Sequence, residues 1–350
     1  YIQSRKDELA ALTPDELGNQ SPEEVEVQIE ILDMYLEMGI QPVSTTMGYY
    51  GQDQTDAGAW KSEQLQLIQT SKLSLVRGES ENNTPLTKTQ RRELESNIEV
   101  ALKRLSTDTP PVDSTSFPAM MDVSTSSLEL VSLLLMVIAG GILATEFGTG
   151  TVKLLLITPH RRSKIFWSKA LLLLEVILIT SGAMFVMSFF VSGLFTGFSD
   201  LAAMQVTPLF GTVVRIPYLL FILLKYLLFL LPVIAYASLA LMLSAVTRKS
   251  AVAIAVSILL TFGSEMVLSI VALVGAMAGF TIPGLKFLLF SNTSLGAYFP
   301  SSMGGMSLTG GLSSTVDGTM TLGFSVVILL IYTVCFLWIA RDSFCRRDIK

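Results

Sequence analysis

The sequence predicts an all-α membrane protein, a polytopic helical bundle that carries a separate polar helical domain. Of the 350 residues, 51% are apolar and only 15% are charged, whereas a soluble globular protein carries about 25% charged residues. The charges are also divided unevenly, since residues 1–122 have a net charge of −11 and residues 123–350 a net charge of +6. The first segment is therefore expected to lie in water and the second in the membrane.

Residues 1–122 are expected to fold as a helical domain. Thr13–Glu16 and Ser21–Glu24 each combine a capping residue, a proline at the first helical position and a glutamate three residues after the cap, which is typical of a helix N-terminus. The stretches 39–60 and 107–118 are predicted to be loops. Apolar residues at helical spacing predict three helix faces: Val25, Ile29, Leu32 and Leu36; Leu65, Ile68 and Leu75; and Leu94, Ile98, Ala101 and Leu105.

Five apolar runs in residues 123–350 are long enough to cross a bilayer, whose core of about 30 Å needs roughly 20 helical residues. The predicted spans are 125–145, 169–196, 217–245, 251–279 and 322–340. Pro232 lies inside the third run and is expected to kink it. Residues 280–321 are too polar to span, and Ile282 to Phe290 are expected to form a short helix at the membrane surface.

Basic residues gather in the connections that would share one side of the membrane. The positive-inside rule makes that side cytoplasmic. Residues 1–122, 197–216 and 280–321 are then extracellular, the protein lies in the plasma membrane, and parity predicts a sixth span before Tyr1. The basic residues concerned, 11 of the 14 in this part, are Lys153, Arg161, Arg162, Lys164, Lys169, Arg248, Lys249, Arg341, Arg346, Arg347 and Lys350.

The cytoplasmic loop 146–168 has a distinctive order of residues. A carboxylate stands where the first run leaves the membrane, and a Gly-Thr pair that can end one helix and cap the next follows. An apolar patch, a proline and a basic cluster complete the loop. The residues in this order are Glu146, Gly150, Thr151, Leu154, Leu155, Pro159, Arg162, Ile165 and Lys169. In this pattern the chain resembles the ABC-2 family of transporter permeases, the membrane subunits of ATP-driven exporters.

The resemblance implies a permease subunit that is not itself an enzyme. ATP and Mg would be bound by a separate ATPase subunit, and no G-x-x-x-x-G-K-[ST] phosphate loop occurs in the chain. Residues 147–158 would form the coupling helix that docks on the ATPase, with polar contacts of Glu146 and Arg162 fixing it. Two permeases work with two ATPases in this family, so a homodimer or a pair with a paralogue is expected, surrounded by membrane lipids and without a nucleic-acid partner.

Three ionisable residues within the predicted spans, Glu175, Lys225 and Glu265, are candidates for the substrate path because charges are costly there. Glu265 could contact a cation or a peptide amine, or pair with Lys225; a structural pair or snorkelling side chains would equally account for all three. His160 is the only histidine, so neither a histidine-based triad nor a multi-histidine zinc site can form within one chain.

Together these features predict the permease of an ABC-2-type exporter that moves an amphipathic substrate, such as an antimicrobial peptide or lantibiotic, a lipid-like compound or a drug, out of the cell. Two alternatives remain. One is a membrane sensor or immunity protein that binds an extracellular ligand through residues 1–122 without transport. The other is an ion (Na⁺) exporter of the same family.

Overall fold

The computed structural model describes residues 2–11, 21–40, 59–79, 85–86, 88–112, 115–149, 161–198, 201–209, 212–278, 282–298 and 320–346. The chain divides into two compact units. The first unit comprises Tyr1–Val112 and Met204–Ile216, and the second comprises Asp113–Ala203 and Pro217–Lys350. We call them the polar unit and the membrane unit.

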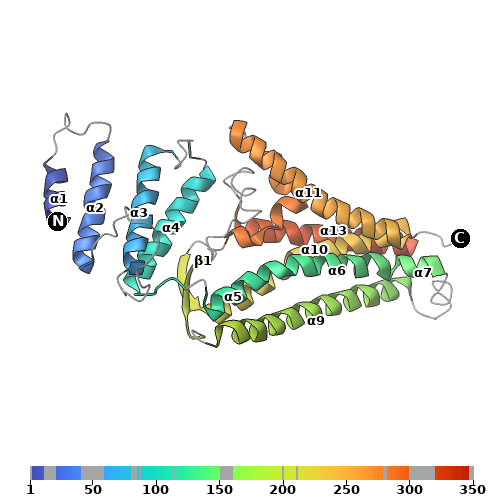
Figure 1. The fold of residues 1–350 in the computed structure, drawn as a ribbon. Helices are drawn as coiled ribbons and strands as arrows, with labels where there is room; N and C mark the ends of the chain where they lie inside the picture. The colour runs from blue at the N-terminus through green and yellow to red at the C-terminus, as the bar shows by residue number, and fades with distance from the viewer. Residues whose placement is uncertain are drawn as a thin grey trace. The chain divides into compact units, whose positions relative to one another are not determined.

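The polar unit is built on four helices that lie side by side in chain order (Figure 1). They are α1 (Ile2–Ala10), α2 (Pro22–Met38), α3 (Ala59–Arg77) and α4 (Lys88–Ser106). Their shared core is small and consists of Ile31, Tyr35, Leu65, Ile68, Ala101 and Leu105. The helical character predicted for residues 1–122 is therefore confirmed for the described part of this segment.

The start of α2 matches its prediction, but the later part of its buried face does not. The Ser21 hydroxyl accepts a hydrogen bond from the Glu24 amide at 3.2 Å, which confirms the cap. Val25 of the predicted face is buried, but further along the helix Ile31 and Tyr35 are buried whereas Leu36 is 38% exposed, so the prediction was wrong there by one residue, or about 100° around the helix. The reason is Tyr35, which buries its ring and donates its hydroxyl to the Ser62 carbonyl at 3.2 Å. The predicted cap at Thr13–Glu16 lies outside the described residues.

A β-hairpin completes the polar unit and was not predicted. Strands β1 (Met204–Leu209) and β2 (Thr212–Pro217) pair in a two-stranded sheet, and β1 packs against α4. The signal was present in the sequence, because residues 206–216 are rich in valine, threonine and isoleucine on either side of Gly211. Such β-branched runs around a glycine are typical of a hairpin.

Among its described residues, the membrane unit has five helical segments long and apolar enough to cross a bilayer. The first, Phe117–Thr149, is made of α5 (Phe117–Val123), a 3₁₀ turn (Ser124–Ser126), α6 (Ser127–Ile142) and α7 (Ala144–Thr149). The others are α9 (Arg162–Thr196), α10 (Tyr218–Thr247), α11 (Ser250–Ala278) and α13 (Leu322–Arg346). Each predicted span falls on one of them, and the protein is an all-α polytopic membrane protein with a hairpin added.

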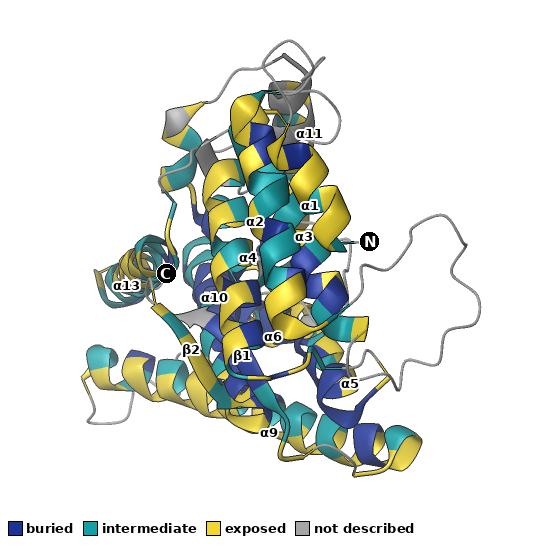
Figure 2. Ribbon diagram, turned by 90° about the vertical axis from the view of Figure 1, so that its left-hand side faces the viewer, coloured by how far each residue is buried: buried dark blue, intermediate teal, exposed yellow. Residues whose placement is uncertain are grey.

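Helix α10 lies at the centre of the membrane unit. It contacts α6, α9, α11 and α13, and most of its last half is buried. Pro232 lies inside it, and the helix continues through this residue. Helix α9 is the opposite case, because exposed residues run along much of its length (Figure 2).

The boundary between the units lies ten residues earlier than the expected position after residue 122. Helix α5, which was assigned to the polar domain, packs on α9 in the membrane unit. The Phe117 ring meets the Phe189 ring edge-on at 5.2 Å. Burial of α5 against a membrane helix therefore places Asp122 within the bundle.

Residues 282–298 form three 3₁₀ turns, η2 (Pro283–Phe287), η3 (Leu289–Asn292) and η4 (Leu295–Tyr298), in place of the predicted short helix. Leu289 and Leu295 pack with Ala235 of α10 and Leu329 of α13. The Asn292 amide holds the turns together by donating to the carbonyls of Lys286 and Leu288, each at 2.8 Å.

The first prediction concerns the close contact between α6 and α11. A Cβ added at Gly140 would lie 2.8 Å from the Ile254 side chain and 3.3 Å from its backbone, so Gly140→Ala is expected to destabilise the bundle by about 1–3 kcal/mol through overpacking. Gly141→Ala is the matched control, because its nearest neighbour would be 3.9 Å away. Thermal unfolding in detergent measures both; equal stability of the two variants would contradict the packing described here.

Candidate functional site

The first span is interrupted at the end of the bundle where residues 150–160 connect α7 to α9, which we call the loop end. Leu143 is a turn residue between α6 and α7. The Ala144 amide that follows bonds to the Ser244 hydroxyl of α10 at 2.9 Å. Since a backbone amide inside an apolar bundle must find an acceptor, Ser244 stabilises the break and lets α7 begin as a separate segment.

Glu146 of α7 and Lys169 of α9 form an ion pair at 2.5 Å. Their side chains are only 16% and 27% exposed, respectively, so the pair is less screened by solvent than a surface pair. These are the first and last residues of the loop pattern found in the sequence, and the fold joins them directly. The pair therefore fixes the distance between the two ends of the connecting segment.

Aromatic and cationic contacts surround this pair. The Phe147 ring packs edge-on against Phe344 of α13, with 6.0 Å between the ring centroids. The Arg248 guanidinium lies over the Phe147 ring, 5.0 Å from its centroid. Arg248 ends α10 with a φ of 55°, which points the chain into the α10–α11 turn. Phe344 also contacts Phe166 of α9 at 6.2 Å.

Five residues, Glu146, Phe147, Lys169, Arg248 and Phe344, thus connect α7, α9, the end of α10 and α13, and we call them the loop-end clamp. Arg341 extends it, because its guanidinium Nε donates to the Ser163 hydroxyl at 3.2 Å. No group of three or more His, Cys, Asp or Glu side chains that could hold a metal occurs among the described residues. The arrangement is suited to transmitting force between helices.

The rest of the predicted coupling residues divide into two groups. Arg162 is described and is the first residue of α9, one turn from the clamp's Phe166 contact. The others lie outside the described residues: Gly150, Thr151, Leu154, Leu155 and Pro159.

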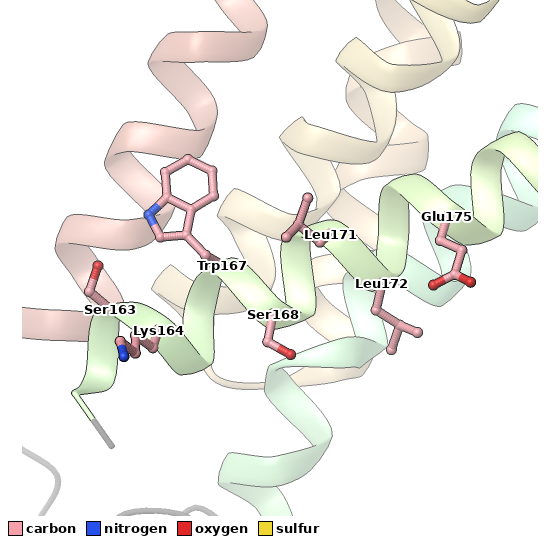
Figure 3. Close-up of a pocket in the computed structure, with 7 residues that line it drawn as sticks. All are labelled: Ser163, Lys164, Trp167, Ser168, Leu171, Leu172 and Glu175. Atoms are coloured by element: carbon pink, nitrogen blue, oxygen red, sulfur yellow. The ribbon is translucent and has the colours of Figure 1, made fainter. Parts of the chain in front are cut away.

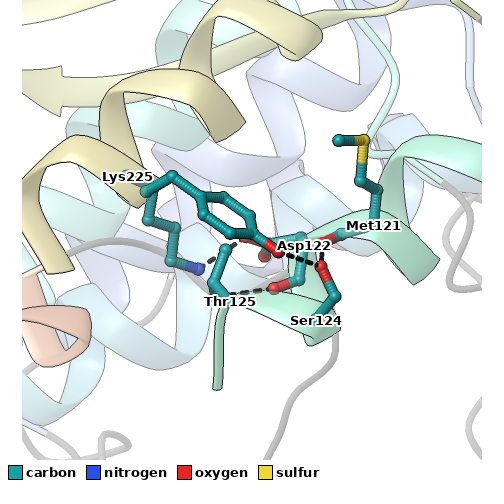
Figure 4. A network of polar contacts seen from close by, with 6 residues as sticks. Met121, Asp122, Ser124, Thr125 and Lys225 are labelled. Carbon is teal, nitrogen blue, oxygen red and sulfur yellow. Dashed lines mark hydrogen bonds and ion pairs between the residues drawn. The ribbon is translucent and has the colours of Figure 1, made fainter. Parts of the chain in front are cut away.

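Lys225 pairs with Asp122, not with Glu265. The Lys225 ammonium lies 2.6 Å from the Asp122 carboxylate, and the two side chains are 9% and 5% exposed. Figure 4 shows this pair with Ser124 beside it. The hydroxyls of Ser124 and Tyr226 bond at 2.7 Å, and the Tyr226 hydroxyl donates to the Ser188 hydroxyl of α9 at 3.3 Å. This network ties α5, α9 and α10 together at the end of the bundle opposite to the clamp.

Glu265 of α11 accepts a hydrogen bond from the buried Tyr236 hydroxyl of α10 at 2.8 Å. Glu265 and the Tyr236 phenol therefore lie together where α10 and α11 meet, while Glu129 at the start of α6 is exposed. A role of Glu265 in a substrate path stays a prediction.

Glu175, the third candidate, lies in a different environment from Glu265. It is exposed on α9 and borders a shallow groove of about 540 Å³ along the outside of this helix. Ser163, Lys164, Trp167, Ser168, Leu171 and Leu172 line the remainder of this groove (Figure 3). The three candidate path residues are thus in three different places.

Several site residues were missed because their partners are distant in sequence. Asp122 lies 103 residues from Lys225, and Ser244 lies 100 residues from Ala144. A weak signal existed for Asp122, which is an acidic residue shortly before the apolar run that starts at Leu128. Nothing in the local sequence distinguishes Tyr236 or Phe344 from other apolar core residues.

The chain belongs to the family described as a protein of unknown function, DUF2705, which matches residues 102–350. Two proteins of Bacillus subtilis (strain 168) are similar to it. The uncharacterized protein YhcI is 32% identical over 227 residues, which cover 63% of this chain but only 65% of YhcI. The uncharacterized membrane protein YdbK is 30% identical over 221 residues, which cover 63% of this chain and 78% of YdbK. No solved structure matches the chain.

The second prediction concerns the contribution of the Glu146–Lys169 pair to stability. Lys169→Met leaves the partly buried Glu146 without its cation and is expected to lower stability by about 1.5–3 kcal/mol, the usual contribution of a hydrogen bond to a charged group. The exchange Glu146→Lys/Lys169→Glu restores opposite charges and should recover most of the loss. Thermal unfolding in detergent tests this, and a double exchange as unstable as the single variant would argue against a direct pair.

The third prediction concerns the buried Asp122–Lys225 pair at the opposite end of the bundle. Lys225→Met leaves Asp122 buried without a counter-charge, which is expected to cost about 3–5 kcal/mol. Replacing both partners, as Asp122→Leu/Lys225→Met, removes the uncompensated charge and should be near neutral. Unfolding by SDS titration measures the series; a double variant that loses as much as the single one would contradict the pairing.

Proposed function

We propose that this protein is the permease subunit of an ABC-2-type exporter, driven by a separate ATPase that binds ATP and Mg. The observation that carries the proposal is the clamp at the two ends of the connecting segment 150–160. Glu146 and Lys169, the outermost residues of the ABC-2-like pattern, form an ion pair at 2.5 Å. A segment held in this way can be pushed by a soluble partner without separating from the spans.

The clamp explains how such a push would reach the substrate path. Phe147 contacts Phe344 and lies under the Arg248 guanidinium, so a movement of α7 acts on α13 and on the α10–α11 turn together. The Leu143 break allows α7 to tilt relative to α6, since Ser244 already satisfies the Ala144 amide. ATP binding in the partner would in this way change the packing of the spans.

The substrate is proposed to be amphipathic and cationic, such as an antimicrobial peptide. Glu265 provides an acidic side chain where α10 and α11 meet, hydrogen-bonded to the Tyr236 hydroxyl, and the proposed orientation puts the polar unit outside the cell at the plasma membrane, where it would meet exported substrate. The same carboxyl group favours an ion (Na⁺) exporter as the second candidate. A sensor without transport would need no loop-end clamp.

The fourth prediction concerns the proposed ATPase subunit. When the full chain is expressed with a candidate ATPase, such as a Walker-motif protein from a neighbouring reading frame, and purified in nanodiscs, the two are expected to co-purify, and substrate is expected to stimulate ATP hydrolysis in liposomes. Lys169→Met should uncouple the pair, lowering stimulated hydrolysis while the ATPase alone keeps its basal rate. Lys72→Met is the matched control, because it removes an ion pair with Glu30 at 2.5 Å in the polar unit.

Two results would overturn this proposal. One is an absence of any ATPase partner in every nucleotide state. The other is labelling that places Lys164 and Arg346, which flank the clamp, on the outer surface of intact cells.

A further inference from the structure

The turns η2, η3 and η4 penetrate the bundle between its helices. They follow α11 and precede α13 in the chain, and η3 contacts both of these helices (Figure 1). The Phe290 ring of η3 stacks on the Tyr236 ring of α10, with 6.4 Å between the ring centroids and 21° between the ring planes. The Tyr332 hydroxyl of α13 donates to the Phe287 carbonyl of η2 at 3.1 Å.

The two tyrosines place these contacts at bilayer depth. Helix α10 has 30 residues and is therefore about 45 Å long, compared with about 30 Å for the bilayer core. Tyr236 stands 11 residues before Thr247, the last residue of α10, and so lies about 16 Å from the nearer end of this helix. Tyr332 stands 10 residues after Leu322, the first residue of α13, about 15 Å along that helix. With the helices centred in the core, Phe290 reaches well inside it.

Irregular backbone at this depth is restricted by the same rule that applies to the spans. Lipid offers no hydrogen bonds, so a non-helical segment occurs within a membrane only where it is buried in protein or lines a water-filled cavity. Protein contacts satisfy part of this segment, because Asn292 Nδ2 donates to the carbonyls of Lys286 and Leu288. The segment nevertheless carries several polar side chains at a depth where water would be needed to solvate them.

Two side-chain oxygens of η3, Asn292 Oδ1 and Ser291 Oγ, are buried and have no hydrogen-bond partner among the described residues. The Asn292 side chain is only 2% exposed. Its orientation is fixed, because both carbonyls that it contacts can only accept, so the nitrogen faces them and the oxygen faces away. An amide oxygen is itself only an acceptor and requires an N–H or O–H donor or a cation.

The Glu265 carboxylate is connected to these oxygens by two contacts. It accepts a hydrogen bond from the Tyr236 hydroxyl at 2.8 Å, and the Tyr236 ring stacks on Phe290, the residue immediately before Ser291. The Thr293 hydroxyl donates to the Phe290 carbonyl at 3.0 Å, which holds the chain in its turn beside Tyr236. The region thus combines one carboxylate with oxygen acceptors, the groups that suit water and hard cations.

We propose that residues 283–298 form a re-entrant element that lines a water-filled pocket leading to Glu265, and that this pocket takes a positively charged group. Glu265 supplies the negative charge, and the oxygens of Ser291 and Asn292 supply acceptors. The stack of Phe290 on Tyr236 keeps the Tyr236 hydroxyl on the carboxylate. The choice of a cationic occupant rests on the proposed function, whereas the pocket itself follows from the depth of the turns and their unpartnered oxygens.

Cysteine labelling tests whether water reaches this depth. In a chain with Cys335 and Cys345 replaced by serine, Ser291→Cys is expected to react with a membrane-impermeant cationic methanethiosulfonate added to open membrane fragments. Two controls should react about tenfold more slowly or less, because a thiol surrounded by apolar groups does not ionise. Ser257→Cys replaces a buried serine of α11, and Leu289→Cys replaces a buried residue of η3 that packs on α10 and α13.

The comparison separates a pocket from a general opening of the turns. Equal rates at the three positions, or no reaction of Ser291→Cys, would overturn the pocket. The measurement needs neither ATP nor substrate. A failure to co-purify with an ATPase would therefore leave the pocket standing, and a dry Ser291→Cys would leave the proposed function standing.

Charge selectivity tests the cationic occupant. The reaction rates of Ser291→Cys with the cationic reagent and with an anionic analogue are each divided by the rate with a free thiol in solution, and the ratio should favour the cation. Glu265→Gln is expected to lower this preference about two- to fivefold, as removal of one nearby charge does. Glu175→Gln is the matched control, because it removes an exposed carboxylate of α9. No preference for the cation, or an equal effect of both substitutions, would overturn the cationic occupant.

Discussion

The structure of the membrane unit depends on one constraint: a polar group inside an apolar bundle must find its partner within the protein, because lipid supplies none. The Ala144 amide, freed where the first span breaks, bonds to Ser244. The Lys225 ammonium, buried two turns into α10, pairs with Asp122. The Glu146 carboxylate at the loop end pairs with Lys169. Each partner comes from a different helix, so each satisfied polar group also fixes one helix against another.

These polar contacts differ between the two ends of the bundle. At one end, a buried ion pair and a hydroxyl chain connect α5, α10 and α9, and the low exposure of the pair makes separation of its charges costly. At the loop end, the Glu146–Lys169 pair is partly exposed and is supported by an aromatic and a cation–π contact, each of which costs less to break than a buried ion pair. The loop end is therefore the end at which helices can shift with less loss of stability.

The sequence was sufficient to predict the positions of the spans but not the contacts between them. Long apolar runs identify membrane helices because lipid imposes one composition on the whole length of a helix, and all five were placed correctly. Glu146 and Lys169 were found because they bracket one short loop. Asp122 and Ser244 were not found, since a pairing across about 100 residues leaves no local pattern. The later part of the α2 face was misjudged because Tyr35 buries a ring that bears a polar group. The hairpin was missed because residues 197–216 were considered only as an extracellular connection between two spans.

The same constraint connects the clamp to the core along α9. Lys169 belongs to the clamp and Phe166 contacts the Phe344 ring, and Leu173 and Ile177 continue this side of the helix into the core. A helix that carries a clamp residue and core residues on the same side cannot shift at the loop end without changing its contacts with the core. A displacement of the clamp would therefore be passed along α9 into the bundle.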